Sequence, residues 1–243
     1  MSSDAPSRIH LFLLLIAALL LGLSSILSLI FKSAAFFPRK DFILLHGAES
    51  SYRHDIKTSP SLPMFPTYLD DGAIGPVLGS GFLCLFLSLI AVILVSTSLR
   101  KGPLLMVTRS PILILSILLV QYLFSLGALI HTFLIHHLSA HFEPSHRANP
   151  YDHGIFDPET WTCEIYSWHS SMGREVSFLH RQCIFEEASR WALIPVLIFS
   201  TGFGVFAVLA IVAERAIIIA REKTKNFEVD VAYDYDSPSV YSR

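Results

Sequence analysis

The chain contains 243 residues, of which 52% are hydrophobic and only 16% are charged, and its formal net charge is −2. The apolar residues are concentrated in four long blocks, a distribution that excludes an ordinary soluble globular protein. A net charge near zero gives no basis for nucleic-acid binding. Because roughly 20 apolar residues span a bilayer as a helix, the sequence predicts an all-α fold, a four-helix transmembrane bundle.

The first block, residues 9 to 31, has no formally charged side chain and predicts a spanning helix. A cleaved signal peptide is the alternative, because small residues follow at Ser33 to Ala35. The apolar stretch is longer than the roughly 7 to 15 residues of such signals, which favours retention. Residues 32 to 72 contain four prolines and predict an irregular outer loop, with a short extended piece at Phe42 to Leu45.

Three more apolar blocks predict spans at residues 73 to 99, 112 to 136 and 191 to 220. In the second span, glycines are spaced for close helix approach, and the fourth span contains a proline and two glycines. These residues are Gly75, Gly79 and Gly81 in the second span, and Pro195, Gly202 and Gly204 in the fourth. The polar composition of residues 221 to 243 predicts a flexible tail.

The distribution of basic residues predicts the orientation of the chain. Residues 1 to 8, 99 to 111 and 213 to 243 hold nine Lys and Arg in 52 positions. The opposite set of flanking segments also holds nine, but over 98 positions, so the density is about twofold lower there. Both termini are therefore expected in the cytosol, with the chain in the plasma membrane or a secretory-pathway membrane.

Cysteine usage tests the same orientation. Cys163 and Cys183 both lie in the predicted second outer loop, residues 137 to 190, whereas Cys84 lies inside the second span. In an oxidising compartment the two loop cysteines can bond, closing a loop of about 20 residues and contributing about 3 kcal/mol. The alternative is two free thiols in a cytosolic loop. Within this loop, residues 172 to 190 have a helical pattern that leads directly into the fourth span.

Histidine is the sharpest local feature, because six of the eleven histidines lie between residues 131 and 153. On a helix, His137 and His141 would share a face and could ligate a metal, with Glu143 or His146 completing the set. A cluster at a membrane boundary is more often solvated, and it can respond to pH because imidazole titrates near neutrality. A metal site at His137, His141 and His146 is therefore a secondary expectation.

Polar residues inside the spans are few. Gln121 and His131 in the third span are the strongest, and no acidic or basic residue lies deep in any span. Gln121 is expected to bond a serine of a neighbouring helix, such as Ser88 or Ser200. The absence of buried charge disfavours an ion-coupled transporter. No redox, hydrolase, nucleotide-binding or zinc-protease motif is present, so an enzyme is the minority interpretation and no cofactor is expected.

The layout of four spans with a larger second outer loop holding cysteines resembles that of tetraspanins, although the Cys-Cys-Gly motif of that family is absent. More locally, the loop resembles that of uncharacterised tetraspan membrane proteins of filamentous fungi, a group that implies no known activity. The residues that carry this resemblance are Glu159-Thr160-Trp161-Thr162-Cys163, then Cys183, and finally Ala188-Ser189-Arg190-Trp191.

These observations favour a multi-pass membrane protein that acts as a non-enzymatic scaffold or organiser. Its expected partners are the lipid bilayer and other membrane proteins, or a further copy of itself, through helix packing and the large outer loop. One alternative is a small-molecule channel or transporter that uses Gln121, His131 and a fourth helix broken between Pro195 and Gly204. Another is a metal-dependent membrane enzyme built on the histidine cluster.

Overall fold

The structure is a computed structural model that describes residues 5–46, 69–101, 111–142, 154–171 and 177–236. The long regular elements of this part of the chain are all helices. Four of them are long and apolar enough to cross a membrane, which confirms the predicted fold class. The helices are α1 (Ala5–His46), α2 (Ile74–Lys101), α4 (Pro111–Leu138), α5 (Pro158–Ser171) and α6 (Ser177–Asp236).

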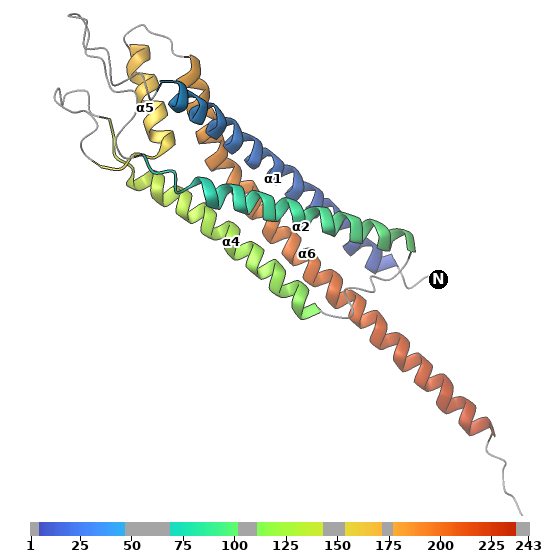
Figure 1. Cartoon of the computed structure of the whole chain (residues 1–243). Coiled ribbons are helices and arrows are strands. Elements are labelled where there is room, and N and C mark those ends of the chain that lie inside the picture. The colour runs from blue at the N-terminus through green and yellow to red at the C-terminus, as the bar shows by residue number, and fades with distance from the viewer. Residues whose placement is uncertain (1–4, 47–68, 102–110, 143–153, 172–176, 237–243) are drawn as a thin grey trace, which may run out of the picture.

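The four long helices form an antiparallel bundle, and α5 lies at one end of it (Figure 1). Both the start of α1 and the end of α6 lie at the opposite end. The helix α1 packs most extensively, against α6 and α2, whereas α4 contacts α6 and α2 over smaller areas. We call α5, the preceding residues 154–157 and the first part of α6, residues 177–190, the cap.

The core of the bundle is built on small residues of α1. Ala17, Ala18 and Leu21 are almost fully buried and meet Cys84 of α2 and Val196 of α6. Small side chains matter here because lipid tails are as apolar as the helices, so close packing rather than water exclusion holds spanning helices together. The bundle is therefore tightest where α1 meets α2 and α6.

Two glycines mark the closest approaches in this core. A Cβ atom at Gly22 would lie 2.8 Å from Ser88 Oγ, and one at Gly81 would lie 2.8 Å from Leu29 Cδ2. By contrast, a Cβ atom at Gly75 would meet nothing within 4 Å. The expectation of close approach is therefore right for Gly81 and for Gly79, whose Cβ atom would lie 3.2 Å from the Phe124 ring, and wrong for Gly75.

The cap has its own small core. Phe156, Trp161 and Ile165 pack on Leu179 of α6, and all four are at most 4% exposed. Backbone hydrogen bonds hold the preceding segment on both sides: Asp70 donates to the Phe156 carbonyl at 2.8 Å. Ala140 donates to the Ile155 carbonyl at 2.9 Å. The cap is thus a packed layer and not an irregular loop.

The sequence-based boundaries differ from the structure at three places. The first helix continues to His46, so the irregular loop from residue 32 and the extended piece at Phe42 to Leu45 were wrong for this stretch. The physical reason is tertiary packing, since Ala35 is fully buried and Phe31 stacks on Phe185 of α6 with centroids 6.4 Å apart. Residues 47–68 lie outside the described part of the chain.

The second difference is α5, which was not predicted, and the third is the length of α6. The predicted helix from residue 172 into the fourth span is confirmed from Ser177 onward. However, α6 does not end near Ala220 but continues to Asp236, where a flexible tail was expected. No proline or glycine occurs between Gly204 and Asp236, so nothing in the sequence stops the helix before Ser237 and Pro238.

Candidate functional site at the junction of cap and bundle

The site begins with the N-terminus of α5, which Asp157 caps. Its Oδ1 accepts hydrogen bonds from the backbone N–H groups of Glu159, at 2.5 Å, and Thr160, at 3.2 Å. Its Oδ2 accepts the Thr160 hydroxyl at 2.7 Å. Pro158 occupies the first helical position, where its missing N–H costs nothing. This local chemistry fixes where α5 starts and which way its first turn faces.

Glu159, in that first turn, forms a bidentate ion pair with α6. Arg190 Nε lies 2.8 Å from Glu159 Oε2, and Arg190 Nη2 lies 2.6 Å from Oε1. The Arg190 guanidinium also lies 5.0 Å from the ring centre of Phe133 and 5.2 Å from that of Trp191. A two-point pair of this kind fixes orientation as well as distance, so it holds α5 in register with α6.

A second ion pair joins α1 to α6 and is almost fully buried. Lys32 Nζ lies 2.5 Å from Glu186 Oε2, and the two side chains are only 4% and 3% exposed. The other carboxylate oxygen of Glu186 is buried and has no hydrogen-bond partner among the described residues. Buried charges without full hydrogen bonding are costly, so both partners are needed at this position.

His136, near the end of α4, adds the third helix to this junction. Its Nδ1 lies 2.8 Å from Asp157 Oδ2, and Ser139 Oγ accepts the Asp157 N–H at 2.9 Å. A cavity of about 20 Å³ lies among these groups and is lined by Lys32, Asp157 and Glu186 with their neighbours. That volume suits about one water molecule and is too small for an organic ligand.

The predicted disulfide is present and completes the attachment. Cys163 of α5 bonds Cys183 of α6, with Cα atoms 4.9 Å apart. Cys84 is a buried free thiol in α2, as expected. One covalent bond therefore holds α5 to α6 within the cap, and polar contacts hold the cap to α1 and α4. Among the residues that the structure describes, the cavity at this junction is smaller than an organic substrate.

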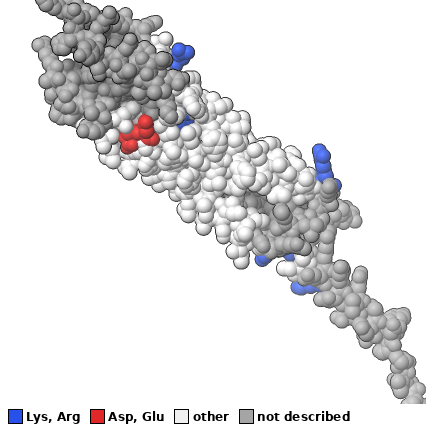
Figure 2. All heavy atoms as spheres, viewed as in Figure 1, with Lys and Arg blue, Asp and Glu red and all other residues white. Residues whose placement is uncertain are grey.

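Aromatic side chains mark the level at which the cap meets the spans. Trp191 is 49% exposed and packs edge-to-face on Phe133, with ring centres 5.7 Å apart. Tryptophan at the edge of an apolar span is typical of a membrane interface. Glu214 lies 23 residues later, about 35 Å along α6, which matches the thickness of a bilayer core. On the face shown in Figure 2, charged side chains are absent between these two ends.

Gln121 lies in the interior, as predicted. It is 1% exposed and donates to Ser200 Oγ of α6 at 3.0 Å, so the prediction of a serine partner is confirmed with Ser200 and not with Ser88. Its amide nitrogen also lies 3.4 Å from Cys84 Sγ of α2. Ser125, one turn along α4, bonds Ser80 at 3.1 Å. These side-chain contacts connect α4 to both α2 and α6 inside the bundle.

The structure sets one residue of the predicted channel path apart from the others. His131 is exposed on α4, whereas Gln121 points into the bundle. The fourth spanning helix is not broken, because α6 continues through Pro195 and both following glycines. Gln121 therefore contacts the Pro195–Gly204 segment through Ser200, whereas His131 does not face either of them.

The predicted metal ligands are only partly described. His137 is exposed on the last turn of α4, and α4 ends at Leu138, so His141 does not share its helical face. His141 Nδ1 instead lies 2.6 Å from Glu164 Oε1 of α5. His146 lies outside the described residues. Within the described ranges, no group of three or more His, Cys, Asp or Glu could hold a metal ion.

Sequence reasoning did not identify the charged residues of the junction. One local signal was available, since Asp157-Pro158-Glu159 is a cap, a first-turn proline and a first-turn acid in succession. No comparable signal exists for Lys32 and Glu186, because they are 154 residues apart in the sequence.

Comparison of this chain with protein-family models, curated proteins and solved structures finds no match.

Proposed function

We propose that this multi-pass membrane protein is a non-enzymatic scaffold that presents its cap in a fixed position above the bilayer. The observation that carries this proposal is the rigid attachment of the cap. Arg190 with Glu159 and the Cys163–Cys183 bond join α5 to α6 within the cap, and Lys32 with Glu186 and His136 with Asp157 join the cap to α1 and α4. A surface that must recognise neighbouring proteins benefits from such rigidity, because less conformational entropy is lost on binding.

The proposal also assigns an orientation. The cap lies on the extracellular or luminal side of the membrane, and both termini lie in the cytosol. A disulfide persists in an oxidising compartment, and the basic residues near the other end, such as Arg100 and Arg215, suit the cytosolic face. The four-span layout agrees with the resemblance to tetraspan proteins, which stays a prediction.

The experiment compares the neighbours of the wild-type protein with those of a variant whose cap is loosened. A labelling enzyme fused to the cytosolic end would mark neighbouring membrane proteins in cells, for the wild type and for Cys163→Ser combined with Glu159→Gln. A scaffold loses a defined set of neighbours in the variant when the two proteins are compared at the same level in the membrane. Identical neighbours for both proteins would contradict the proposal.

A second candidate function is a small-molecule transporter. The buried Lys32–Glu186 pair favours it, because ionisable residues buried in or near spans often serve transport. Purified protein in liposomes would then move a solute, and Glu186→Gln would abolish the flux. The third candidate, a metal-dependent enzyme, predicts bound metal in elemental analysis that is lost in His137→Ala and His141→Ala.

A further inference from the structure

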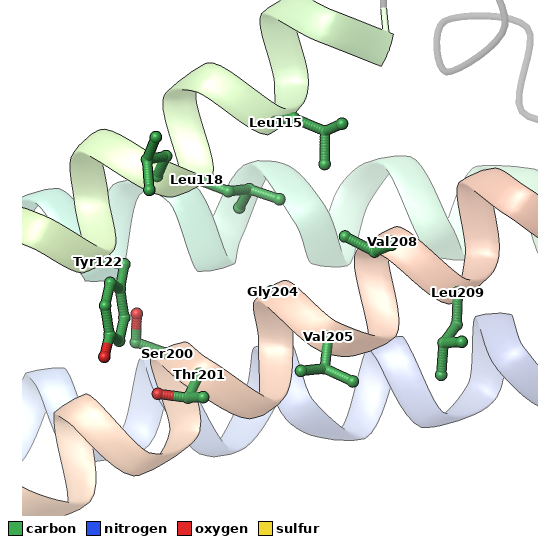
Figure 3. A pocket seen from close by; sticks show the side chains of 10 residues that line it. Leu115, Leu118, Tyr122, Ser200, Thr201, Gly204, Val205, Val208 and Leu209 are labelled. Atoms are coloured by element: carbon green, nitrogen blue, oxygen red, sulfur yellow. The ribbon is translucent and has the colours of Figure 1, made fainter.

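An open groove runs along the membrane-spanning part of the bundle between α4 and α6. Its volume is about 440 Å³, and six of its ten lining residues are Leu or Val. Gly204 lies on the α6 side, and a Cβ atom added there would meet nothing within 4 Å. Tyr122 of α4 and Ser200 and Thr201 of α6 lie together at one end of the groove (Figure 3).

The hydroxyl groups at this end are not all satisfied. Ser200 accepts from Gln121 and Thr201 donates to the Leu197 carbonyl at 2.8 Å. Tyr122 makes no hydrogen bond to any residue that the structure describes. Tyr122 lies 11 positions from Pro111, where α4 starts, and 11 positions from Phe133, so its backbone is near the middle of the span. A polar group without a partner at that depth is unfavourable, because the surrounding lipid tails offer none.

We infer that this groove is the contact surface of a homodimer, in which a second copy of this chain packs its own α4 and α6 against it. Lipid tails can fill the apolar walls but cannot bond Tyr122. A second copy in the same orientation brings its own Tyr122 and Thr201 to the same depth, so each Tyr122 hydroxyl gains an acceptor across a twofold axis. Hydrogen-bond complementarity at matching depth therefore selects a second copy as the occupant.

The burial of the helices supports the same surface. Only 17% of the most apolar stretch of α4 is buried within one chain, against 44% for α1. The open space at Gly204 would let the helices of two copies approach closely, as small residues do in other spanning pairs. This inference rests on the proposed scaffold function, and it identifies a second copy of the chain as one partner of the scaffold.

The experiment counts subunits by single-molecule photobleaching of the full-length protein in liposomes, over a range of protein-to-lipid ratios. Wild-type protein should be dimeric, and Tyr122→Phe should weaken the dimer by about threefold to tenfold. Gly204→Leu should make the protein monomeric, because the side chain fills the groove. Gly202→Leu is the matched control: it lies in the same helix, has equally open space and is outside the groove lining, so dimerisation should persist.

A second measurement does not depend on weakening the dimer. Under oxidising conditions Val205→Cys should form a disulfide between copies, whereas Phe86→Cys, which is at least as exposed on α2, should not. Monomers at every ratio, a dimer that survives Gly204→Leu, or equal cross-linking at both positions would each overturn the inference. Loosening the cap with Cys163→Ser should leave the dimer intact. A solute flux would overturn the scaffold function without affecting these dimer results.

Discussion

At the scale of single residues, the most consequential feature is a buried ion pair between helices that are far apart in the sequence. Lys32 and Glu186 are both withdrawn from solvent, and one oxygen of Glu186 has no partner among the described residues. A buried ion pair as a whole adds little to the free energy of unfolding, because both charges lose their hydration. Removing only one partner is costly, because the other charge then stays buried without a counter-charge.

Removing one partner should therefore cost far more than removing both. Lys32→Met leaves an uncompensated buried carboxylate and should lower the free energy of unfolding by about 3 to 5 kcal/mol. Adding Glu186→Leu to that variant should recover most of the loss. Unfolding by SDS titration measures both effects, and losses that simply add in the double variant would contradict the pairing.

The second prediction at this scale concerns the disulfide. Cys163→Ser should lower the free energy of unfolding by about 3 kcal/mol, because the bond closes a loop of 20 residues. Cys183→Ser should cause the same loss, and the double variant should lose no more than either single one. Thermal unfolding under non-reducing conditions measures this, and unequal losses would point to a role of one cysteine outside the bond.

At the scale of helices, two kinds of contact hold the bundle together. Small residues let α1 approach α2 closely, and a chain of polar side chains joins α2, α4 and α6 through Gln121, Ser125 and their partners. In lipid both kinds matter, since apolar contact between helices replaces apolar contact with lipid at little gain.

Gln121→Leu tests the polar contact. It removes the bonds to Ser200 and Cys84 and should lower the free energy of unfolding by about 0.6 to 2 kcal/mol. Ser116→Ala is the control, because its exposed hydroxyl on the same helix bonds only the local Ile112 carbonyl. A loss for Ser116→Ala equal to that for Gln121→Leu would show that helix contacts are not what Gln121 supplies.

Gly81→Val and Gly75→Val test the close approach of α1 and α2. The added side chain at Gly81 collides with Leu29 and should lower the free energy of unfolding by about 1 to 3 kcal/mol more than the same change at Gly75. Both positions lie in α2, with Gly75 in its first turn and Gly81 in its interior. Equal losses would mean that Leu29 moves aside freely.

At the scale of the whole molecule, charged side chains lie at the two ends of the bundle, and the long segment between them is apolar on the face drawn in Figure 2. Acidic side chains appear near the cap on the face drawn in Figure 2, and basic side chains lie at both ends. The cap and the far end of α6 are therefore expected on opposite sides of the membrane.

This topology is testable with a thiol reagent that does not cross membranes. In intact cells, Ser170→Cys in the cap should be labelled, whereas Lys223→Cys on α6 should be labelled only after the membrane is permeabilised. Both positions are exposed in the structure, so a difference in labelling reports the side of the membrane. Labelling of Lys223→Cys alone in intact cells would reverse the orientation.

The four spans and the disulfide partners could be predicted from the amino-acid order alone. Spans are visible because the length of an apolar run is a local property, and only two cysteines lie outside the spans. The close contact at Gly81 and the partner of Gln121 were also predictable, since glycine and glutamine in a span each imply a neighbouring helix.

Tertiary structure alone decided the junction of cap and bundle. Lys32, Glu159, Glu186 and Arg190 belong to three helices, and nothing in their local sequence specifies which charge meets which. It also decided that α1 continues to His46, because burial of Ala35 and stacking of Phe31 on Phe185 of α6 outweighed the loop composition around Pro38. Ion pairing and burial depend on distances through space, whereas periodicity and composition report only on neighbours along the chain.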